Sequence, residues 1–516
     1  MQTAIRRPRA RPGGLVAAAV LLAASLAGCA GGGISHPSTV MPAAYQAPGK
    51  SDPALSPQAL DAWWRLYDDP QLTGLVEGAM QASPDARTGL QRIAESRAAR
   101  SQALAAYLPQ GDLLGSAQNQ HTSESFGGLG VSTGLGSTTT GTGSVGTTGT
   151  TGTTTTSDSG AVLTPSGSLQ TYAAQFNVSY ELDIFGRRRA AKRAADADLW
   201  TQRFDYEAVR SMLATNVAND LFQARGDAIQ LAEARETYRI AQSLARSADL
   251  SASHGLTSTS DAARLESDAA TDAAEVVRLE AVGRAARRTL LDLVGRGLDG
   301  IETLVVEPVA VAPPVPPQTT PGELLRRRPD VREAQARLQS AAGTLDLDRL
   351  GLFPDFSLAP ALELAKTTGT YDSFSTIWSL GLNATAPVLD RPRLLAIVRG
   401  QRARGEQAVI AYEKAVQDAY RDAENGLNTL DADRRRGASL QTAVDRARFA
   451  FDAKRRGYDL GLTDLTTLLA AESTWRQARL TLSTAQVTTL MDSATLFQAL
   501  GGGWTPPPMP QRVAAR

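Results

Sequence analysis

The chain has 516 residues, which is long enough for a large core or for several domains. Its 53 Lys and Arg residues balance its 53 Asp and Glu residues, so no overall electric field favours nucleic acid as a partner. Aromatic residues make up only 5%, which is low for a compact enzyme and suits long, closely packed helices. After an apolar run near the N-terminus, no stretch of the chain reaches 18 apolar residues. We therefore expect no membrane-spanning helix in the mature chain.

The N-terminus, residues 1–28, has the pattern of a bacterial lipoprotein signal peptide. After an arginine-rich start, the apolar run from Leu15 to Leu26 is too short to span a bilayer as a helix. The run ends in Leu26-Ala27-Gly28-Cys29, a lipobox, so we expect an S-diacylglyceryl and an N-palmitoyl group on Cys29. Cys29 is the only cysteine, so an internal disulfide is excluded. Ala30 follows Cys29, and an aspartate at that position is typical of lipoproteins retained in the inner membrane. Ala30 therefore favours the outer membrane. An ordinary signal peptide with an incidental cysteine is the alternative.

Next come a linker, two helices, two strands and a long helical hairpin, which we group as a linker and a first repeat over residues 58–300. A continuous helix is predicted over 58–81, and Pro84 is a good first residue for the next helix, which stops near Tyr107. The strands show alternating apolar and polar residues, and the tract between them is rich in Gly, Thr and Ser. The predicted bounds are 29–57 for the lipidated linker, about 111–122 and 171–183 for the strands, 123–168 for the loop and 187–294 for the hairpin.

The same order of elements returns in a second repeat. Pro84-Asp85-Ala86-Arg87 corresponds to Pro329-Asp330-Val331-Arg332, 245 residues later, and Gly255-Leu256-Thr257 corresponds to Gly461-Leu462-Thr463, 206 residues later. The difference between the two offsets lies in the first strand region, where the Gly/Thr-rich loop is found. The sequence therefore predicts an internal duplication. The bounds are 301–321 for a Pro/Val-rich connector, 322–503 for the second repeat, about 355–365 and 374–386 for its strands, 393–500 for its hairpin and 504–516 for a Pro-rich tail.

The strands have the length and alternation of membrane β-strands, about 9–11 residues each. Half-buried strands of a soluble sheet are the alternative. In a bilayer every backbone polar group must be paired, so a membrane sheet has to close on itself. Four strands are too few, because the smallest single-chain barrels have about 8. Several chains must then contribute strands, and arithmetic alone allows a dimer or a trimer.

Taken together, these features resemble the TolC-like outer membrane factors. The resemblance rests on the two ordered repeats, the lipobox, the Gly-Leu-Thr turns, and Trp63-Trp64 followed by Asp69-Pro70-Gln71-Leu72. It is strongest with the lipoprotein branch of OprM/NodT type, which serves RND-type efflux pumps. The resemblance implies a mainly α fold with a membrane β-barrel. Three chains would form a 12-stranded outer membrane barrel and an α-helical barrel that crosses the periplasm.

The resemblance also implies a function and partners. The protein would be the exit duct of a tripartite efflux pump, passively conducting small molecules to the outside. It would be a lipid-anchored homotrimer in the cell outer membrane, extending into the periplasm. Its partners would be outer membrane lipid, a periplasmic adaptor (membrane fusion) protein and an inner-membrane RND-type transporter. Two alternatives stay open: a type I protein secretion duct of the same family, and a structural periplasmic coiled-coil lipoprotein without a pore.

No catalytic or metal-binding pattern is present. The histidines His36, His121 and His254 are far apart, and no Cys/His metal spacing, nucleophile elbow or phosphate-binding loop occurs. We therefore expect neither an enzyme nor a metal site nor another cofactor.

The candidate site residues lie at the two repeated turns. Glycine can end a helix in the left-handed conformation and threonine can cap the next helix, which gives these turns a purely structural interpretation. That interpretation leaves Leu256 and Leu462 as exposed apolar residues, which favours a docking role, and similar turns meet the adaptor in the family. The predicted adaptor-docking residues are Gly255, Leu256, Thr257, Gly461, Leu462 and Thr463.

Asp464 is the candidate residue of a periplasmic gate. Threefold symmetry would place three copies around a narrow opening, where a ring of carboxylates attracts cations. The resemblance supports this role, because related channels carry acidic residues at that turn. The first repeat has Ser258 at the matching position, so only one repeat would supply the ring. A helix cap is the alternative role for Asp464.

Overall fold

The computed structural model describes residues 33–47, 52–121, 168–255, 258–309, 312–369 and 372–505. The chain divides into two compact units. One is helical and comprises residues up to 105, 185–353 and 388 onward, and the other consists of strands, in 106–184 and 354–387. The predicted signal peptide, Cys29 and almost all of the predicted loop 123–168 lie outside the described residues.

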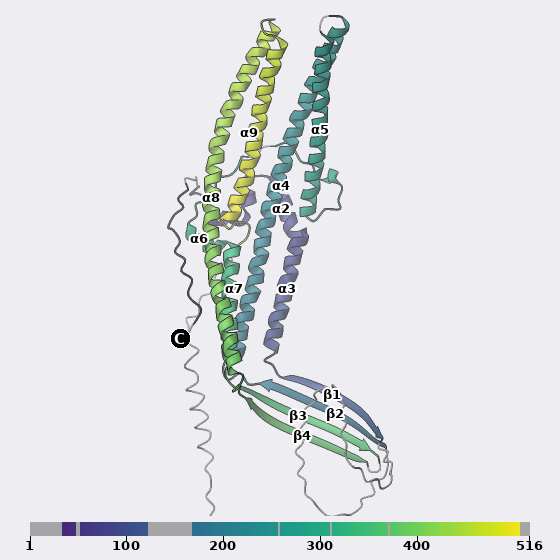
Figure 1. The fold of residues 1–516 in the computed structure, drawn as a ribbon, viewed down its shortest axis with the longest axis vertical. Coiled ribbons are helices and arrows are strands. Elements are labelled where there is room, and N and C mark those ends of the chain that lie inside the picture. The colour runs from purple at the N-terminus through teal and green to yellow at the C-terminus, as the bar shows by residue number, and fades with distance from the viewer. Residues whose placement is uncertain are drawn as a thin grey trace, which may run out of the picture. The chain divides into compact units, whose positions relative to one another are not determined.

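In the helical unit, each repeat supplies short helices followed by a long helical hairpin (Figure 1). Four of the described α-helices begin at a proline, whose fixed φ and missing N–H suit the first helical position. In the first repeat these elements are η2 (Pro57–Tyr67), α2 (Pro70–Ala82), α3 (Pro84–Ala105), α4 (Arg187–Ser253) and α5 (Thr259–Leu293). The connector contains η3 (Ile301–Thr303), and the helices of the second repeat are α6 (Pro321–Arg327), α7 (Pro329–Leu350), α8 (Arg391–Asp459) and α9 (Leu465–Ala499).

The duplication is visible in the helix bounds. Helices α3 and α7 both have 22 residues and begin 245 residues apart, while α5 and α9 both have 35 residues and begin 206 residues apart. These are the two offsets at which the sequence motifs repeat. The predicted fold, a duplicated arrangement of short helices, two strands and a long helical hairpin, is confirmed.

The continuous helix predicted over 58–81 is wrong. The segment is a 3₁₀ helix, η2, and an α-helix, α2, separated at Asp68, which has a left-handed φ of 50°. Asp69 then caps α2, because one of its carboxylate oxygens accepts hydrogen bonds from the backbone N–H groups of Gln71 and Leu72, at 3.0 and 3.1 Å. Pro70 has no N–H with which to continue a helix from η2.

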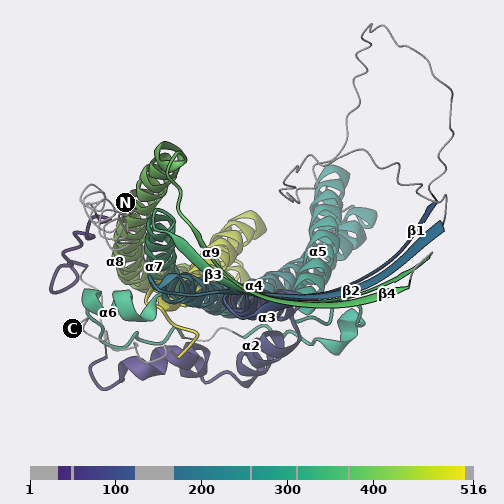
Figure 2. The ribbon, with the colours of Figure 1, turned by 90° about the horizontal axis from the view of Figure 1, so that it is seen from below.

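The four strands form one antiparallel sheet in the order β1-β2-β3-β4 (Figure 2). Cross-strand partners share a face of a sheet, and here the row Leu113, Phe176, Leu362, Trp378 is apolar in every strand. All four of these side chains are exposed. The sheet therefore carries an apolar face that no described residue covers. The strands are β1 (Gln110–His121), β2 (Ser168–Glu181), β3 (Asp355–Thr368) and β4 (Ser373–Thr385).

The main core of the helical unit brings the two repeats together. The ring of Trp63 stacks on that of Phe497, with centroids 5.5 Å apart, and the ring of Tyr67 packs against that of Phe222 at 5.3 Å. Around them lie buried aliphatic residues of α2, α4, α5, α8 and α9. Because elements of both repeats supply this core, the predicted Trp63-Trp64 motif serves to join them.

Each hairpin ends at a glycine that packs against the short helices of its own repeat. Gly295 and Gly501 have φ values of 80° and 79°. A Cβ on Gly295 would lie 2.5 Å from the carbonyl oxygen of Ala82, and one on Gly501 would lie 2.8 Å from the backbone of Arg327. Any other residue at these two positions would have a strained backbone, and its Cβ would clash with these backbone atoms.

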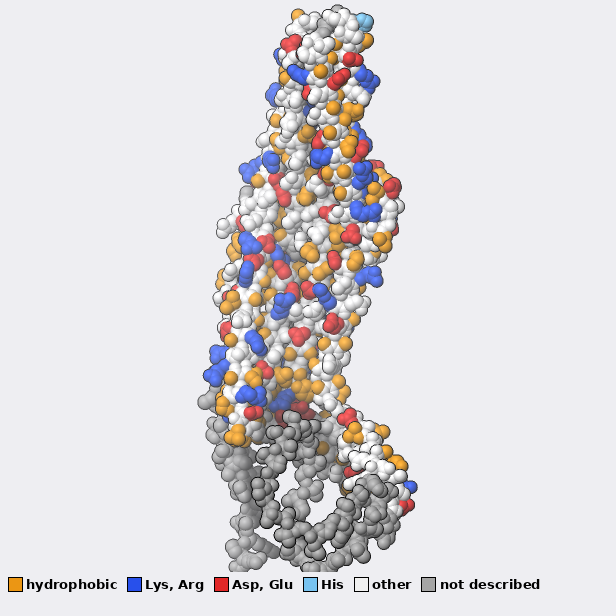
Figure 3. Space-filling model, turned by 45° about the vertical axis from the view of Figure 1, so that its right-hand side comes forward, with side chains coloured by type: hydrophobic (Ala, Val, Ile, Leu, Met, Phe, Trp, Pro, Cys, Tyr) orange, Lys and Arg blue, Asp and Glu red, His pale blue; other side chains and the backbone are white. Residues whose placement is uncertain are grey.

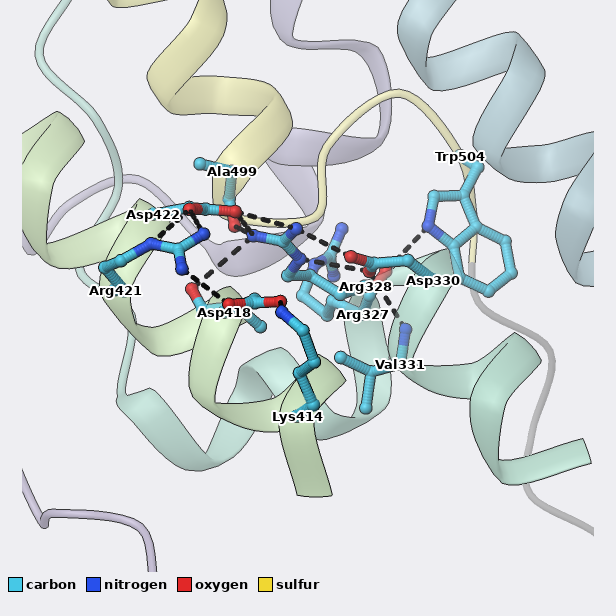
Figure 4. A network of polar contacts seen from close by, with 11 residues as sticks. Arg327, Arg328, Asp330, Val331, Lys414, Asp418, Arg421, Asp422, Ala499 and Trp504 are labelled. Carbon is cyan, nitrogen blue, oxygen red and sulfur yellow. Dashed lines mark hydrogen bonds and ion pairs between the residues drawn. The ribbon is translucent and has the colours of Figure 1, made fainter. Parts of the chain in front are cut away.

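A polar network fixes the end of α9 to α6, α7 and α8 (Figure 4). The guanidinium of Arg328 reaches Asp330 at 2.7 Å and Asp422 of α8 at 3.3 Å. The indole N–H of Trp504 donates to the carbonyl oxygen of Arg327 at 2.7 Å. This network holds the C-terminal segment on the same helices that the core joins.

Candidate functional site

The two hairpin tips have matching backbone geometry. Gly255 and Gly461 have φ values of 71° and 66°, the left-handed conformation that ends a helix. Their N–H groups donate to the carbonyl oxygens of Ala252 and Tyr458, at 3.0 and 2.9 Å. Leu256 and Thr257 of the first tip lie outside the described residues, so the second tip provides the detailed geometry.

The helices after the tips begin at equivalent residues of different chemistry. Ser258 caps α5 by accepting a hydrogen bond from the N–H of Ser260, at 3.2 Å. Asp464 caps α9: one carboxylate oxygen accepts from the N–H of Thr467 at 2.8 Å, and the other accepts from its hydroxyl at 2.9 Å. The cap of α9 is thus Asp464, the alternative role considered for this residue, and the cap lies one residue after Thr463.

The carboxylate of Asp464 is held in its charged form at an exposed position. The hydrogen bonds from the backbone and the hydroxyl of Thr467 lower the pKa of this carboxyl group. Asp464 thus has the cap role, and its negative charge is present at neutral pH. The cap contact leaves the charge facing solvent at the tip, so a cap and a gate role are compatible.

The second tip exposes two leucines. Leu462 is 80% exposed, and its N–H donates to the carbonyl oxygen of Gly457 at 2.8 Å, which fixes its backbone. Leu460, one turn position before Gly461, is 73% exposed. The sequence prediction included Leu462 and did not name Leu460. The tip therefore presents apolar side chains to solvent from a hydrogen-bonded turn.

A groove of about 470 Å³ lies between α4, α5 and α9. Thr466, two residues after Asp464, lines it, and so does Glu472, a charged residue that is only 8% exposed. Burial raises the pKa of Asp272, on the opposite wall, while the charge of Arg476 opposes that rise. Sequence analysis missed this groove, although Glu472 and its repeat partner Glu266 are a signal that could have drawn attention to it.

Other functions have little support in the described part of the chain. Acidic and basic side chains alternate over the face of the helical unit seen in Figure 3, with no field of one sign. Among the described residues, His, Cys, Asp and Glu form no group of three or more that could hold a metal ion. None of the described helices is long and apolar enough to cross a membrane.

Comparison with known proteins identifies the fold and the family of relatives. The chain matches the family described as outer membrane efflux protein over residues 75–296 and 320–502. It is 28% identical over 460 residues to the pyoverdine export outer membrane protein OpmQ of Pseudomonas aeruginosa, covering 89% of this chain and 90% of that protein. It is 24% identical to the probable outer membrane lipoprotein SilC of Salmonella typhimurium, covering 88% and 90%. The solved structure of the outer-membrane channel OprN has a similar fold, with a TM-score of 0.73 at 24% identity over 93% of this chain and 100% of that chain.

Proposed function

Because this chain belongs to the outer membrane efflux protein family, we propose that it is the exit duct of a tripartite efflux pump in the outer membrane. The observation that carries the proposal is the family match across both repeats, together with the two hairpins and the sheet that those repeats form. The family predicted from the sequence motifs is confirmed. The duct conducts small molecules passively from a periplasmic adaptor and an inner-membrane RND-type transporter.

A homotrimer accounts for the sheet. Its edge strands β1 and β4 have unpaired outer edges within the described residues, and its apolar face is exposed. Unpaired strand edges are not tolerated in hydrocarbon, so copies of the sheet must pair edge to edge. Three copies give a closed sheet of 12 strands, the number that the family resemblance implies.

A lipid on Cys29 anchors the trimer to the outer membrane. The lipobox supports this anchor, and the relative SilC is described as a probable outer membrane lipoprotein. Two acyl groups on the thiol-linked glycerol and one on the amine give firm membrane binding. Radioactive palmitate should label the wild-type protein and leave Cys29→Ser unlabelled.

The hairpin tips are the adaptor-docking surface, comprising Gly255, Leu256 and Thr257 of the first repeat and Gly461, Leu462 and Thr463 of the second. Leu462, exposed on a hydrogen-bonded turn, can bind an apolar partner at low cost in conformational entropy. The pseudo-equivalence of the two tips gives a trimer six similar docking positions. Asp464, which only the second repeat carries, adds a ring of three charges and is the candidate periplasmic gate.

Complementation of a deletion strain tests this function. The deletion should increase retention of at least one member of a panel of drugs, solvents, metal cations and siderophores, and the wild-type gene should restore export. The double variant Leu256→Asp, Leu462→Asp should fail to restore export and lose crosslinking to the adaptor. Leu298→Asp is the matched control, because Leu298 is fully exposed outside the tips. Full export and adaptor crosslinking by the double variant would contradict the docking proposal.

A further inference from the structure

The groove between α4, α5 and α9 is formed by both repeats. Helices α4 and α5 belong to the first repeat and α9 to the second, so the groove depends on the two hairpins lying side by side. A Cβ on Gly226 would lie 2.8 Å from Cγ2 of Val487, so the absence of a side chain at residue 226 lets α4 and α9 approach closely. Further along the same two helices, an ion pair joins Glu233 to Arg479. Packing and charge thus hold the walls of the groove together.

Apolar side chains from all three helices line the groove. Ile240 and Leu244 come from α4, Leu265 from α5 and Leu469 from α9, and all four are half-buried. The volume of about 470 Å³ lies within the range of pockets that hold small organic molecules, about 300–1,000 Å³. An α-helix is about 10–12 Å across with its side chains, so the groove has room for about one helical turn. Its size therefore favours a small organic molecule over a helix of a partner protein.

Glu472 is a charged side chain of this groove that has no partner. More than nine-tenths of the residue is buried. Among the described residues, Glu472 takes part in no hydrogen bond or ion pair. A carboxylate that has lost most of its contact with water is unfavourable without a cationic partner. A positively charged group bound in the groove would supply that partner.

The other charged side chains of the groove act on one another in opposite pairs. Arg264 lies 4.0 Å from Asp268, one turn along α5. The charge of Arg476 on α9 acts on Asp272 of α5. Two arginines and three acidic residues line the groove, so one negative charge is left over. The groove thus combines an apolar lining with an excess negative charge, which is that of Glu472.

We propose that this groove is a binding site for amphiphilic organic cations, whose positive group pairs with Glu472 and whose apolar part contacts the leucine and isoleucine side chains. A bare metal ion fits less well, because the described residues offer no group of three or more His, Cys, Asp and Glu that could hold one. The equivalent residue of the first repeat, Glu266, is exposed and lies outside the lining. The inference does not depend on the proposed duct, since binding is measured on the purified protein.

Two ions of the same shape test the sign of the charge. Tetraphenylphosphonium and tetraphenylborate have similar apolar surfaces and opposite charges. Equilibrium dialysis uses the full-length protein in lipid nanodiscs, with empty nanodiscs as the blank. The wild type should bind tetraphenylphosphonium saturably, with one site per chain, and bind tetraphenylborate only as the blank does. Glu472→Gln should weaken tetraphenylphosphonium binding at least tenfold, and the matched control Glu266→Gln should leave it unchanged.

Protection of an introduced thiol tests the location of the site. Ser473 is an exposed residue of the groove lining, and its equivalent in the first repeat, Ser267, is exposed on α5 outside the lining. N-ethylmaleimide should label Ser473→Cys at least fivefold more slowly when tetraphenylphosphonium is saturating. Labelling of the control Ser267→Cys should not change. Both variants keep Glu472, so this test holds even where Glu472→Gln fails to fold. Equal labelling of Ser473→Cys with and without the cation would overturn the proposal.

The remaining outcomes separate this site from other roles of the groove. Saturable binding of both ions with equal affinity would overturn the proposal, because the site would then be merely apolar. Unchanged tetraphenylphosphonium binding by Glu472→Gln, combined with lost crosslinking to the adaptor, would overturn it in favour of a protein-docking surface. Weakened cation binding with full export would support the site and leave the proposed duct intact.

Discussion

Asp464 and Ser258 occupy equivalent cap positions at the starts of α9 and α5, and they differ in charge. Both residues cap their helices through side-chain oxygens, so the structural task is shared and the charge is not. The predicted Asp464 gate and the Asp464 cap therefore need not compete. A substitution that keeps the cap and removes the charge separates the two roles.

Asp464→Ser is that substitution, since serine is as good an N-cap as aspartate. We expect unchanged trimer stability and a cation preference lowered severalfold in single-channel recordings, because a ring of three carboxylates is lost. Ser258→Asp is the reciprocal control and should increase the cation preference. Wild-type ion selectivity in Asp464→Ser would restrict this residue to capping.

At the scale of elements, Asp69 joins α2 to α4. Its carboxylate caps α2 and forms a two-point ion pair with the guanidinium of Arg225, and both side chains are buried. Burial by itself raises the pKa of Asp69, but the hydrogen bonds from Arg225, Leu72 and Gln71 and the charge of Arg225 outweigh it and lower the pKa below its usual value. The sequence motif Asp69-Pro70-Gln71-Leu72 is thus a helix start and a tertiary contact together.

Asp69→Asn should lower the free energy of unfolding by about 3–5 kcal/mol, the cost of leaving a buried charge without its partner. Circular dichroism during urea unfolding measures this loss. Glu77→Gln, which breaks the exposed ion pair with Arg65, should cost no more than about 1 kcal/mol.

The sign of the pH dependence follows from the lowered pKa. The contribution of Asp69 is present above the unfolded pKa of about 3.9 and is lost as the pH falls through the folded value. Asp69→Asn should therefore remove part of the acid sensitivity of unfolding. Equal acid sensitivity in the variant and the wild type would contradict this account of the pair.

Proline and glycine residues that recur at helix ends in both repeats made much of the fold predictable. Pro84 and Pro329 start equivalent helices, and Gly255 and Gly461 end equivalent ones, because these residues act on the backbone locally. The sequence prediction did not include the break at Asp68, because the apolar pattern continues through Pro70 and favoured one helix.

Tertiary contacts explain the features of the site that sequence analysis did not find. Glu472 looks like one more solvated carboxylate in the sequence, and its burial depends on α4 and α5 lying beside α9. The glutamates of α8 that accept hydrogen bonds from Ser35, Ser38 and Gln46 share one helix face, but those three residues lie about 370 residues away in sequence. Such contacts have no local signal.

At the scale of the whole molecule, the two repeats have the same order of elements and together form one sheet and two long helical hairpins. The strands of the repeats join into one sheet whose apolar face and outer edges are open in the single chain. The long hairpins are joined by a shared aromatic core and end in similar tips. In a trimer the open strand edges would pair between copies, and the hairpin tips of the three copies would form one surface. Each chain would then contribute to the proposed membrane pore and to the proposed docking surface.

Conductance of the purified, lipidated protein in planar lipid bilayers tests the central claim most directly, with oligomeric state measured on the same sample by light scattering. The account predicts homotrimers that give discrete and uniform conductance steps, with a cation preference that falls in Asp464→Ser. Trimers that insert stably and conduct nothing at any voltage, or a conducting species that is not a trimer, would contradict it.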